Sequence, residues 1–315
     1  MFTPVIYLDS GYNAGLFFII YYLTMHLFVN DLTVIDFSYL DTARGIVGES
    51  WIVDVALIGQ LNEQNMVLDF GVVKSQIKRI IDDEFDHKLH IPEDSSALIQ
   101  KDSKDGQLSV TFKMDSLDLI HMSAPDSAYC FVQSENISIE EVLPLIRSTV
   151  MRHMPENVKD IEITLRAENI TQEYYHYSHG LKKHDGNCQR IVHGHRSKVT
   201  VFKNGQADKD WQSYWQKRWQ DIYLGSEEDL NQELSTDFCL QNNVLADNYY
   251  GFSYTANQGL FELVCPKAIS DLIDRDSTVE CLAEFMLEVM QQQEPEAEFK
   301  VLAYEGVSKG AIAYS

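Results

Sequence analysis

Residues 168–178 read ENITQEYYHYS, and residues 305–315, at the end of the chain, read EGVSKGAIAYS. Aligned without a gap, both segments begin with glutamate and end with a Tyr-Ser pair. An apolar strand is predicted just before each segment, at 161–165 (IEITL) and at 299–303 (FKVLA). A long-range repeat of this kind indicates that the chain contains two copies of one structural unit.

A helix is predicted in front of each of these two strands. Ser138 with Glu141 in the first copy, and Ser277 with Glu280 in the second, have the spacing of a capping box. The spacing of apolar side chains predicts an earlier helix in each copy. Those side chains are Val73, Ile77, Ile80, Ile81 and Phe85 in the first copy, and Trp211, Trp215, Trp219 and Tyr223 in the second. We interpret the tryptophan stripe as the core face of a helix; an aromatic platform for a ligand is the alternative.

Segments that favour strands complete each copy. The strands and candidate hairpins lie at 27–40, 50–59 and 107–132 in the first copy, and at 174–178, 197–202 and 247–265 in the second. The resulting order, β-β-α-β-β-α-β-β twice, predicts an α+β fold with antiparallel sheets and helices packed on one face. We place the first unit at residues 27–173 and the second at residues 174–315.

Length, charge and cysteine content limit the class of protein. The chain has 315 residues, with 25 Lys and Arg against 48 Asp and Glu, and a formal net charge of −23. This length favours two domains, and the negative charge argues against general binding to nucleic acid or to an anionic membrane. Five scattered cysteines without a Cys-x-x-Cys pair do not form a disulfide framework, and they fit a reducing cytosol. We therefore expect a cytoplasmic protein with no nucleic-acid or membrane partner.

Residues 1–26 are interpreted as an N-terminal extension. The stretch 11–25 has no charged residue, but it is shorter than the ~20 apolar residues of a membrane span. A signal peptide needs a basic N-terminal region, and the first Lys or Arg is Arg44. Three interpretations stay open: a segment upstream of a start at Met25, a buried hairpin, and a peripheral membrane anchor, against which the lack of basic residues argues.

Half of the ten histidines lie between residues 176 and 195. His193 and His195 are two positions apart just before a predicted strand, so their side chains point to the same side. His179, at the end of the preceding strand, supplies a third imidazole. Three histidines with one open position are the usual ligands of a catalytic zinc ion, so this spacing predicts a zinc site. We interpret His176 and His184 as ordinary polar side chains.

Cys188 lies five residues before His193. A divalent cation and an imidazole nearby lower the pKa of a thiol, so Cys188 is the candidate base or nucleophile. The segment 176–203 holds six Lys and Arg and one acid, Asp185, in an otherwise acidic chain. A basic region beside a metal favours a phosphorylated substrate; a solvated turn is the alternative.

The first copy has no such histidine cluster. At the matching positions it has Ser38, Val47 and Glu49, and because valine cannot bind a metal we expect this copy to be metal-free. It does contain Asp86 and His87 directly after its helix. A carboxylate beside an imidazole orients the ring and raises its basicity; a helix-end cap is the alternative interpretation.

Taken together, these residues resemble the family of 6-pyruvoyltetrahydropterin and 6-carboxytetrahydropterin synthases. The features that carry the resemblance are His179, Cys188 and His193-Gly-His195; Asn65–Phe70 before a helix that ends at Phe85-Asp86-His87; Ser138-Ile-Glu140 and Thr278-Val-Glu280 at the second helices; and strands that end in Glu168 and Glu305. The resemblance covers residues 27–315 as two tandem units, apart from 204–250.

The resemblance implies the tunnelling fold (T-fold), an antiparallel sheet with two helices that assembles into a barrel, and hence a homo-oligomer. Carried over residue by residue, it assigns zinc (Zn²⁺) to His179, His193 and His195, proton transfer to Cys188, Asp86 and His87, and substrate binding to Glu305, Glu168 and Thr278. Either glutamate is a candidate for the buried carboxylate that binds the pterin.

The sequence departs from the family pattern in how its parts are divided. The second unit has the zinc ligands without an Asp-His pair after its helix, and the first has Asp86 and His87 without zinc ligands. Because sites in the family lie between subunits, we predict a fused pseudo-dimer with one working site and one inactive twin. Segment 174–178 ends one unit and starts the other, so either it serves both or the barrel is irregular.

The implied substrate is 7,8-dihydroneopterin triphosphate, a pterin triphosphate that a lyase converts with loss of triphosphate. We favour the 6-carboxy product of 7-deazaguanine (queuosine) synthesis over the 6-pyruvoyl product. In this reaction the metal polarises the side-chain hydroxyls of the substrate, and Cys188 with His87 and Asp86 moves the proton. Two alternatives stay open: a zinc-dependent hydrolase on another fold, and a non-catalytic zinc- or pterin-binding module in which Cys188 closes the metal site.

Overall fold

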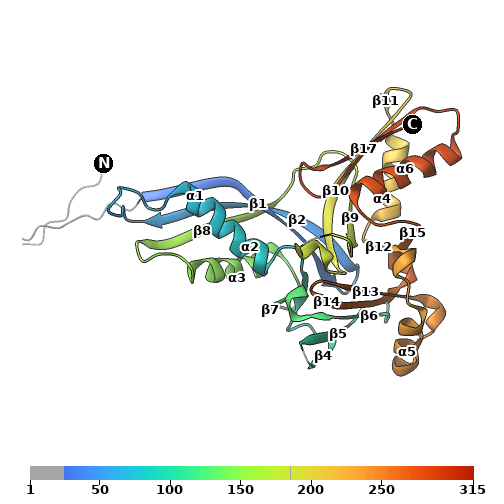
Figure 1. Ribbon diagram of the computed structural model, residues 1–315, viewed down its shortest axis with the longest axis horizontal. Coiled ribbons are helices and arrows are strands. Elements are labelled where there is room, and N and C mark those ends of the chain that lie inside the picture. Colours follow the sequence, from blue (N-terminus) through green and yellow to red (C-terminus); the bar gives the residue numbers. More distant parts are fainter. Residues whose placement is uncertain (1–24, 105, 185) are drawn as a thin grey trace, which may run out of the picture.

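The computed structural model describes residues 25–104, 106–184 and 186–315, which form three β-sheets with helices beside them (Figure 1). The predicted extension 1–26 lies outside the described residues except for its last two positions. Within the three described ranges, no helix is long and apolar enough to cross a membrane.

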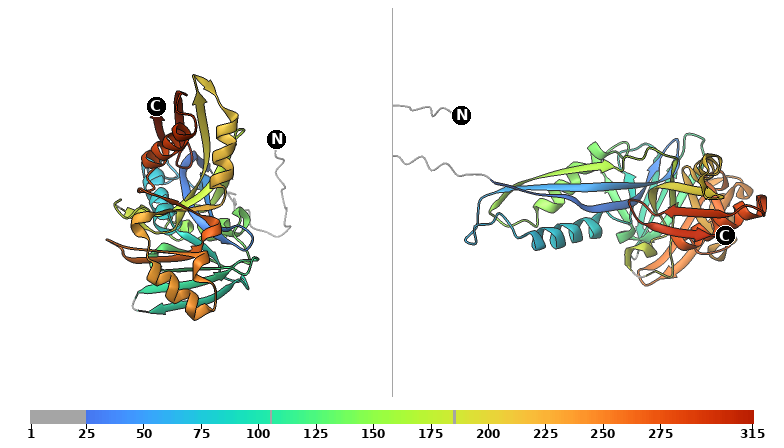
Figure 2. Two further views of the ribbon diagram at one scale, coloured as in Figure 1. Left: turned by 90° about the vertical axis from the view of Figure 1, so that its right-hand side faces the viewer. Right: turned by 90° about the horizontal axis from the view of Figure 1, so that it is seen from above.

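The first sheet has the order β7-β3-β1-β2-β8 and contains two long strands that project from the other two sheets, together with β8 (Figures 1 and 2). Its strands are β1 (Met25–Asp41), β2 (Gly45–Gly59), β3 (Leu89–Pro92), β7 (Tyr129–Val132) and β8 (Val158–Ala167). β1, β2 and β8 pair antiparallel, whereas β3 and β7 continue the sheet as parallel strands. β-Branched and aromatic residues, which favour strands, are frequent in β1 and β2.

The second sheet has the order β15-β12-β9-β10-β16-β17, and β11 pairs with β10. Its strands are β9 (Tyr174–His179), β10 (His193–Lys203), β11 (Gln206–Ala207), β12 (Ile222–Ser226), β15 (Ser270–Ile273), β16 (Phe299–Tyr304) and β17 (Gly310–Tyr314). From β15 to β16 the strand order matches that of the first sheet position by position, with the parallel pairs again on one side. The predicted α+β class is confirmed, although each of these two sheets adds parallel strands to its antiparallel centre.

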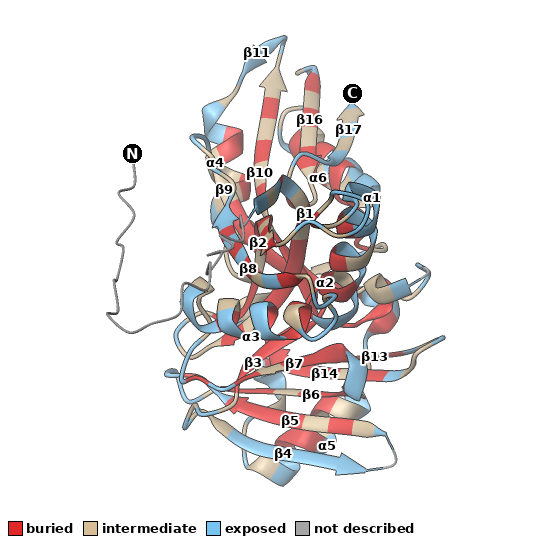
Figure 3. Cartoon of the chain, turned by 90° about the vertical axis from the view of Figure 1, so that its left-hand side faces the viewer, coloured by how far each residue is buried: buried red, intermediate tan, exposed pale blue. Residues whose placement is uncertain are grey.

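The third sheet joins the two halves of the chain. Its order is β13-β14-β6-β5-β4, with bounds β4 (Leu98–Lys104), β5 (Gln107–Lys113), β6 (Leu119–Pro125), β13 (Tyr249–Ala256) and β14 (Gly259–Pro266). Both predicted hairpins are present, one from each half, and they pair with each other through β6 and β14. Figure 3 shows buried residues along this sheet and an exposed edge at β4. The halves therefore share one hydrophobic core here.

Helices cover the first two sheets. α1 (Phe70–Val72), a π-helical turn (Val73–Ile77), α2 (Lys78–Glu84) and α3 (Ile139–Met151) lie beside the first sheet, α4 (Lys209–Trp219) and α6 (Val279–Gln293) lie beside the second, and α5 (Gln232–Asn242) lies beside β13. Short 3-10 helices span Asp126–Ala128, Gly186–Gln189, Glu227–Asp229, Ala246–Asn248 and Lys267–Ile269. The apolar stripe of the first copy is buried in one core cluster, and the tryptophan stripe is buried in another. The fourth residue of the predicted tryptophan stripe, Tyr223, belongs to β12 instead of the helix.

One of the two predicted helix caps is correct. The hydroxyl of Ser138 accepts a hydrogen bond from the backbone N–H of Glu141 at the start of α3. The predicted cap at Ser277 is wrong, because Thr278 caps α6 by accepting from the N–H of Cys281 at 3.3 Å. Ser277 is instead buried and contacts His179.

The first two sheets meet back to back near the middle of the molecule. Ser38 on β1 and Ser178 on β9 share a hydrogen bond of 2.7 Å between their hydroxyl oxygens. A Cβ on Gly194 would lie 2.6 Å from Cα of Gly48, so this close approach of two backbones requires glycine. β9 pairs with β10 and β12 among the described strands, so segment 174–178 belongs to the second sheet and does not serve both.

Candidate metal and catalytic site

Three histidine side chains meet where β9 ends and β10 begins. His193 lies opposite His179 in the antiparallel ladder, and His195 follows two residues later on the same face of β10. All three side chains are buried, and their ligand atoms lie within 4.8 Å of one another. The alternation of a strand thus produces the convergence that the spacing predicted.

The outer nitrogen atoms of these histidines are engaged by oxygen atoms. Nδ1 of His179 lies 2.9 Å from the carbonyl oxygen of Ser277 and 3.0 Å from its hydroxyl. Nδ1 of His193 lies 3.2 Å from the carbonyl oxygen of Arg190. A carbonyl partner requires an N–H on Nδ1, which leaves Nε2 with a free lone pair. Such outer partners fix the tautomer of histidine ligands in metal sites.

His195 follows the same pattern with a carboxylate as its outer partner. Its Nδ1 lies 3.2 Å from Oδ1 of Asp36, and its Nε2 lies 3.2 Å from Nε2 of His179. Two nitrogen ligands at ~2.1 Å from one tetrahedral zinc ion are ~3.4 Å apart, close to this separation. The donor set therefore fits zinc without rearrangement of these two rings.

The protonation states also suit a metal. Burial lowers the pKa of His179 and His193 well below that of free histidine, and the adjacent imidazoles lower it further. Both rings are therefore neutral at physiological pH, the form that binds metal. Within the described part of the chain, the cluster contains three ligands and no fourth His, Cys, Asp or Glu. An open fourth position is typical of catalytic zinc and not of structural zinc.

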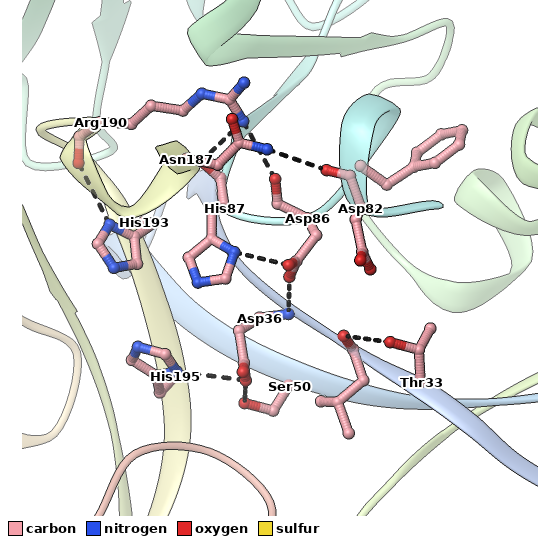
Figure 4. A network of polar contacts seen from close by, with 12 residues as sticks. Thr33, Asp36, Ser50, Asp82, Asp86, His87, Asn187, Arg190, His193 and His195 are labelled. Atoms are coloured by element: carbon pink, nitrogen blue, oxygen red, sulfur yellow. Dashed lines mark hydrogen bonds and ion pairs between the residues drawn. The ribbon is translucent and has the colours of Figure 1, made fainter. Parts of the chain in front are cut away.

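Asp86 and His87 reach this site from the first unit (Figure 4). The ring of His87 lies 5.0 Å from that of His193 and 6.5 Å from that of His195, measured between centroids. A left-handed backbone at His87, with φ of 53°, turns the chain from α2 into β3. The N–H of His87 donates to the carbonyl oxygen of Asp36 at 2.7 Å, which fixes this turn on β1.

His87 lies between an acid and a thiol. Its Nδ1 is 2.6 Å from Oδ2 of Asp86, and the side chain of Cys188 is near enough to raise the pKa of the ring. Burial alone would lower the pKa of His87, but the influence of these two neighbours outweighs burial and raises the pKa to about 10. The imidazole is therefore protonated at neutral pH in the metal-free protein and can hold a proton next to Cys188.

The segment that carries Cys188 is fastened to the first unit on both sides of the thiol. Nη1 of Arg190 donates to the carbonyl oxygens of Asp86 and His87, at 3.1 and 3.3 Å. Nδ2 of Asn187 donates to the carbonyl oxygen of Asp82 at 3.3 Å (Figure 4). These bonds hold the thiol of the second unit against the acid-imidazole pair of the first.

Glu305 approaches the histidines from the loop between β16 and β17. Its Oε1 lies 4.0 Å from Nε2 of His195, and its Oε2 lies 3.9 Å from Nζ of Lys309. Lys309 also pairs with the buried carboxylate of Asp36 at 3.1 Å. The loop thus brings one carboxylate and one cation to the edge of the metal site.

Two other predicted substrate-binding residues lie elsewhere. Oε1 of Glu168 accepts a hydrogen bond from Lys198 at 2.8 Å, and its carbonyl oxygen accepts one from Arg196. Arg196 and Lys198 alternate with His195 along β10, so they point to the opposite face of the strand. The hydroxyl of Thr278 serves as the cap of α6. Of the two glutamates considered as pterin anchors, only the one on the β16–β17 loop lies beside the histidines.

The basic segment 176–203 does not present a free positive surface. Its lysines pair with acids from other segments: Lys182 with Asp229, Lys183 with Asp276, Lys198 with Glu168, and Lys203 with Glu294. Its two arginines donate to backbone oxygens. Four of the six positive charges of this segment are therefore paired within the protein, whereas those of Arg190 and Arg196 face neutral carbonyl oxygens.

The position in the first unit that matches His179 is Tyr39, one residue from the predicted Ser38. Tyr39 lies opposite Val47 in the β1–β2 ladder, just as His179 lies opposite His193. The match of Val47 with His193 holds. Aromatic, aliphatic and acidic side chains thus stand where the second unit has imidazoles.

Four residues that support the site had no signal in the sequence. Asp36 and Ser277 bind the outer nitrogens of the histidines, Ser50 donates to Asp36 at 2.5 Å, and Lys309 pairs with it. Each is a single polar residue whose spacing does not indicate a site, and the capping-box spacing of Ser277 predicted a helix cap instead. The alternation Asp36-Phe37-Ser38 places polar residues on one face of β1, but this pattern alone does not indicate a partner on another sheet.

Comparison with known proteins supports the resemblance. Residues 34–141 match the family model of 6-pyruvoyl tetrahydropterin synthase. The match includes Asp86 and His87 and ends before the histidine cluster. No curated protein matches the chain.

Solved structures of the same kind are similar to part of the chain. The 6-pyruvoyl tetrahydropterin synthase from Plasmodium vivax is 17% identical, with 48% of this chain and 94% of that chain covered and a TM-score of 0.37. The 6-pyruvoyl tetrahydropterin synthase of Plasmodium falciparum is 18% identical, with 47% and 94% covered and a TM-score of 0.37.

Proposed function

We propose that this protein is a zinc-dependent synthase of the 6-carboxytetrahydropterin type, a lyase that converts 7,8-dihydroneopterin triphosphate with loss of triphosphate. The observation that carries the proposal is the convergence, in one site, of the three histidines of the second unit with the Asp86–His87 pair of the first. The ring of His87 lies 5.0 Å from that of His193, and the side chain of Cys188 is near enough to raise the pKa of His87. A metal site beside a protonated imidazole and a thiol suits proton abstraction and return at a carbon next to a hydroxyl.

His179, His193 and His195 would hold the zinc ion, which acts as a Lewis acid on the hydroxyls of the substrate's side chain. Cys188, as thiolate, removes a proton from the adjacent carbon. His87 stabilises that thiolate, because its Nδ1 is engaged by Asp86 and its other ring nitrogen is left to face Cys188. The same ring then returns a proton, while Asp86 keeps its orientation.

Glu305 is the residue that we assign to the pterin ring. A carboxylate accepts two hydrogen bonds in parallel from an amino group and a neighbouring ring N–H, which fixes the orientation of the base. Glu305 is partly exposed at the edge of the site, so a ligand can reach it.

The remaining assignments accompany this function. We propose that the units at 27–173 and 174–315 form a fused pair of T-fold units, in line with the matching strand orders of their sheets. We also propose a cytoplasmic homo-oligomer that belongs to 7-deazaguanine (queuosine) synthesis.

The test is turnover of the pterin triphosphate by the zinc-loaded protein, followed by mass spectrometry. The mass of the product distinguishes the 6-carboxy from the 6-pyruvoyl tetrahydropterin. Cys188→Ala should abolish turnover, whereas Cys239→Ala, at a free cysteine on α5, should not. Zinc and pterin binding without any product would support a non-catalytic module. Full activity of Cys188→Ala with zinc-dependent release of phosphate would favour a hydrolase.

A further inference from the structure

Asp36 is a buried carboxylate on β1 for which the proposed reaction has no role. Its residue is 3% exposed, and it belongs to the first unit although the metal ligands belong to the second. Burial of a carboxylate is costly unless other groups compensate its charge. The partners of the carboxylate therefore indicate what Asp36 is there to hold.

The carboxylate contacts one metal ligand and one cation of the second unit. Oδ1 lies 3.2 Å from Nδ1 of His195 and accepts a hydrogen bond from the hydroxyl of Ser50 at 2.5 Å. Oδ2 lies 3.1 Å from Nζ of Lys309. His195 is almost fully buried, and a carboxylate at Nδ1 directs its Nε2 lone pair toward the site.

The backbone of Asp36 holds the acid-base pair. Its N–H donates to Oδ1 of Asp86 at 2.7 Å, and its carbonyl oxygen accepts from the N–H of His87 at 2.7 Å. The N–H and the carbonyl oxygen of one residue thus fix the turn that carries Asp86 and His87 (Figure 4).

The loop that carries Glu305 closes directly on the same side chain. Gly306 has a left-handed backbone with φ of 70°, and a Cβ at this position would lie 2.4 Å from Oδ1 of Asp36. Only glycine permits this approach. Lys309 completes the contact from the other end of the loop.

We propose that Asp36 is the positioning residue that aligns three parts of the site contributed by different segments: the metal ligand His195, the Asp86–His87 pair, and the β16–β17 loop. Its effect on the metal is exerted through His195, and it touches no substrate. The part of this inference that concerns catalysis rests on the proposed function, whereas the part that concerns metal binding does not.

The residue on β9 that corresponds to Asp36 shows which of the two roles of Asp36 is specific to the metal site. His176 occupies the corresponding position on β9, and its carbonyl oxygen accepts from the N–H of Asp221 at 2.8 Å, as that of Asp36 does from His87. The ring of His176 instead bonds to the carbonyl oxygen of Gly48 at 2.7 Å. The carbonyl contact is therefore common to both sides, and the carboxylate is specific to the side with the histidine cluster.

The test measures metal binding without substrate. Asp36→Asn keeps the shape and the backbone contacts but removes the charge, so we expect zinc affinity to fall about 10- to 100-fold in competition with a chromophoric chelator. The Co²⁺-substituted variant should also show an altered d–d absorption spectrum, which a general loss of stability does not produce. Asp54→Asn, at a partly buried aspartate on β2 paired with Arg166, is the matched control and should bind metal like the wild type.

A second variant keeps the test decisive if Asp36→Asn does not fold. Ser50→Ala removes only the hydroxyl that fixes Oδ1, and we expect a loss of zinc affinity of about tenfold, at the lower end of this range. Unchanged affinity and an unchanged Co²⁺ spectrum in the folded variants would overturn the proposal. A wild-type protein that binds neither metal would overturn it together with the proposed function. Tight metal binding that depends on Asp36, without turnover of the pterin, would refute the proposed function alone.

Discussion

The two sides of the molecule have the same backbone and different chemistry. The strand registers define a second set of corresponding positions, which comes from both units and which we call the twin side. Tyr39, Val47, Glu49, His176 and Asp221 stand on the twin side where the metal side has His179, His193, His195, Asp36 and His87. On both sides, a residue with a left-handed backbone comes just before a parallel strand: His87 before β3, with φ of 53°, and Asp221 before β12, with φ of 59°.

The twin side satisfies its polar groups internally. Arg44 forms a two-pronged ion pair with Asp221, at 3.0 and 2.5 Å, and donates to the hydroxyl of Tyr39 at 2.9 Å. On the metal side the equivalent arginine, Arg190, binds carbonyl oxygens and leaves His87 free to face Cys188. The comparison indicates that the fold fixes the positions, while the side chains make one interface a reactive site and the other a structural joint.

The largest effect should follow removal of a metal ligand. We expect His193→Ala to lose bound zinc and to lower turnover at least ~10³-fold, because several kcal/mol of Lewis-acid stabilisation disappear. Val47→Ala is the matched change on the twin side, and it should keep the metal while it loses stability through a cavity. Metal content and turnover of the two variants are the measurements, and equal zinc content in both would break the comparison.

His87→Ala should have the next largest effect. Loss of a general acid-base group lowers the rate by ~10²- to 10⁴-fold, and zinc should remain bound because His87 is not one of the converging ligands. The measurement is turnover at fixed zinc occupancy. Full activity in this variant would show that the first unit contributes nothing to the site, and the idea of one site built from two units would be wrong.

The metal side shows how much a sequence can reveal. His193 and His195 were identifiable because a strand alternates its side chains, and His179 because a second strand ends nearby. The order of the main strands and helices in each half followed from apolar spacing and from the repeat, whereas the short parallel strands β3, β7, β12 and β15 were not predicted. These patterns are local or periodic, so they can be recognised without knowledge of the tertiary structure.

The features that were missed depend on register or on distant contacts. The match of His179 was placed at Ser38 instead of Tyr39, because the connection from β1 to β2 is much shorter than the one from β9 to β10 and sequence spacing cannot fix the ladder across it. Asp36 meets His195 across two sheets, which no local pattern encodes. α5 was missed because its apolar residues form no continuous stripe.

The pH dependence of stability should report on Glu49, the buried acid that stands on the twin side at the position of His195. Burial raises the pKa of Glu49 to about 7, against the N–H of Ser50 and the charges of Arg196 and Arg44. The folded state therefore binds a proton more tightly than the unfolded state, whose value is near 4.5, and stability falls as the pH rises from about 4.5 to 7. Glu49→Gln removes this loss, so the variant should gain up to about 3 kcal/mol relative to the wild type between pH 4.5 and 8.

The measurement for Glu49 is thermal unfolding of the metal-free protein at both pH values, so that zinc does not contribute. Asp54→Asn is the control, since this carboxylate pairs with Arg166 on the same strand pair and lies away from the twin side. An equal difference in Tm between the variant and the wild type at pH 4.5 and pH 8 would contradict the prediction, because it would mean that Glu49 is solvated and ionised like an ordinary surface acid.

The smallest effect should come from the ion pair that holds the twin side together. Arg44 lies in the turn between β1 and β2, and Asp221 lies just before β12, so the pair joins the two units. Because both side chains are partly exposed, we expect Arg44→Gln or Asp221→Asn to cost about 1 kcal/mol, and the cost should shrink in high salt. Turnover and zinc content should stay at the wild-type level, because neither residue is one of the converging metal ligands His179, His193 and His195. A double-mutant cycle from thermal unfolding measures the pair. A coupling near zero would mean that the units are joined by their shared core alone, and reduced turnover in either variant would mean that the two sides are not independent.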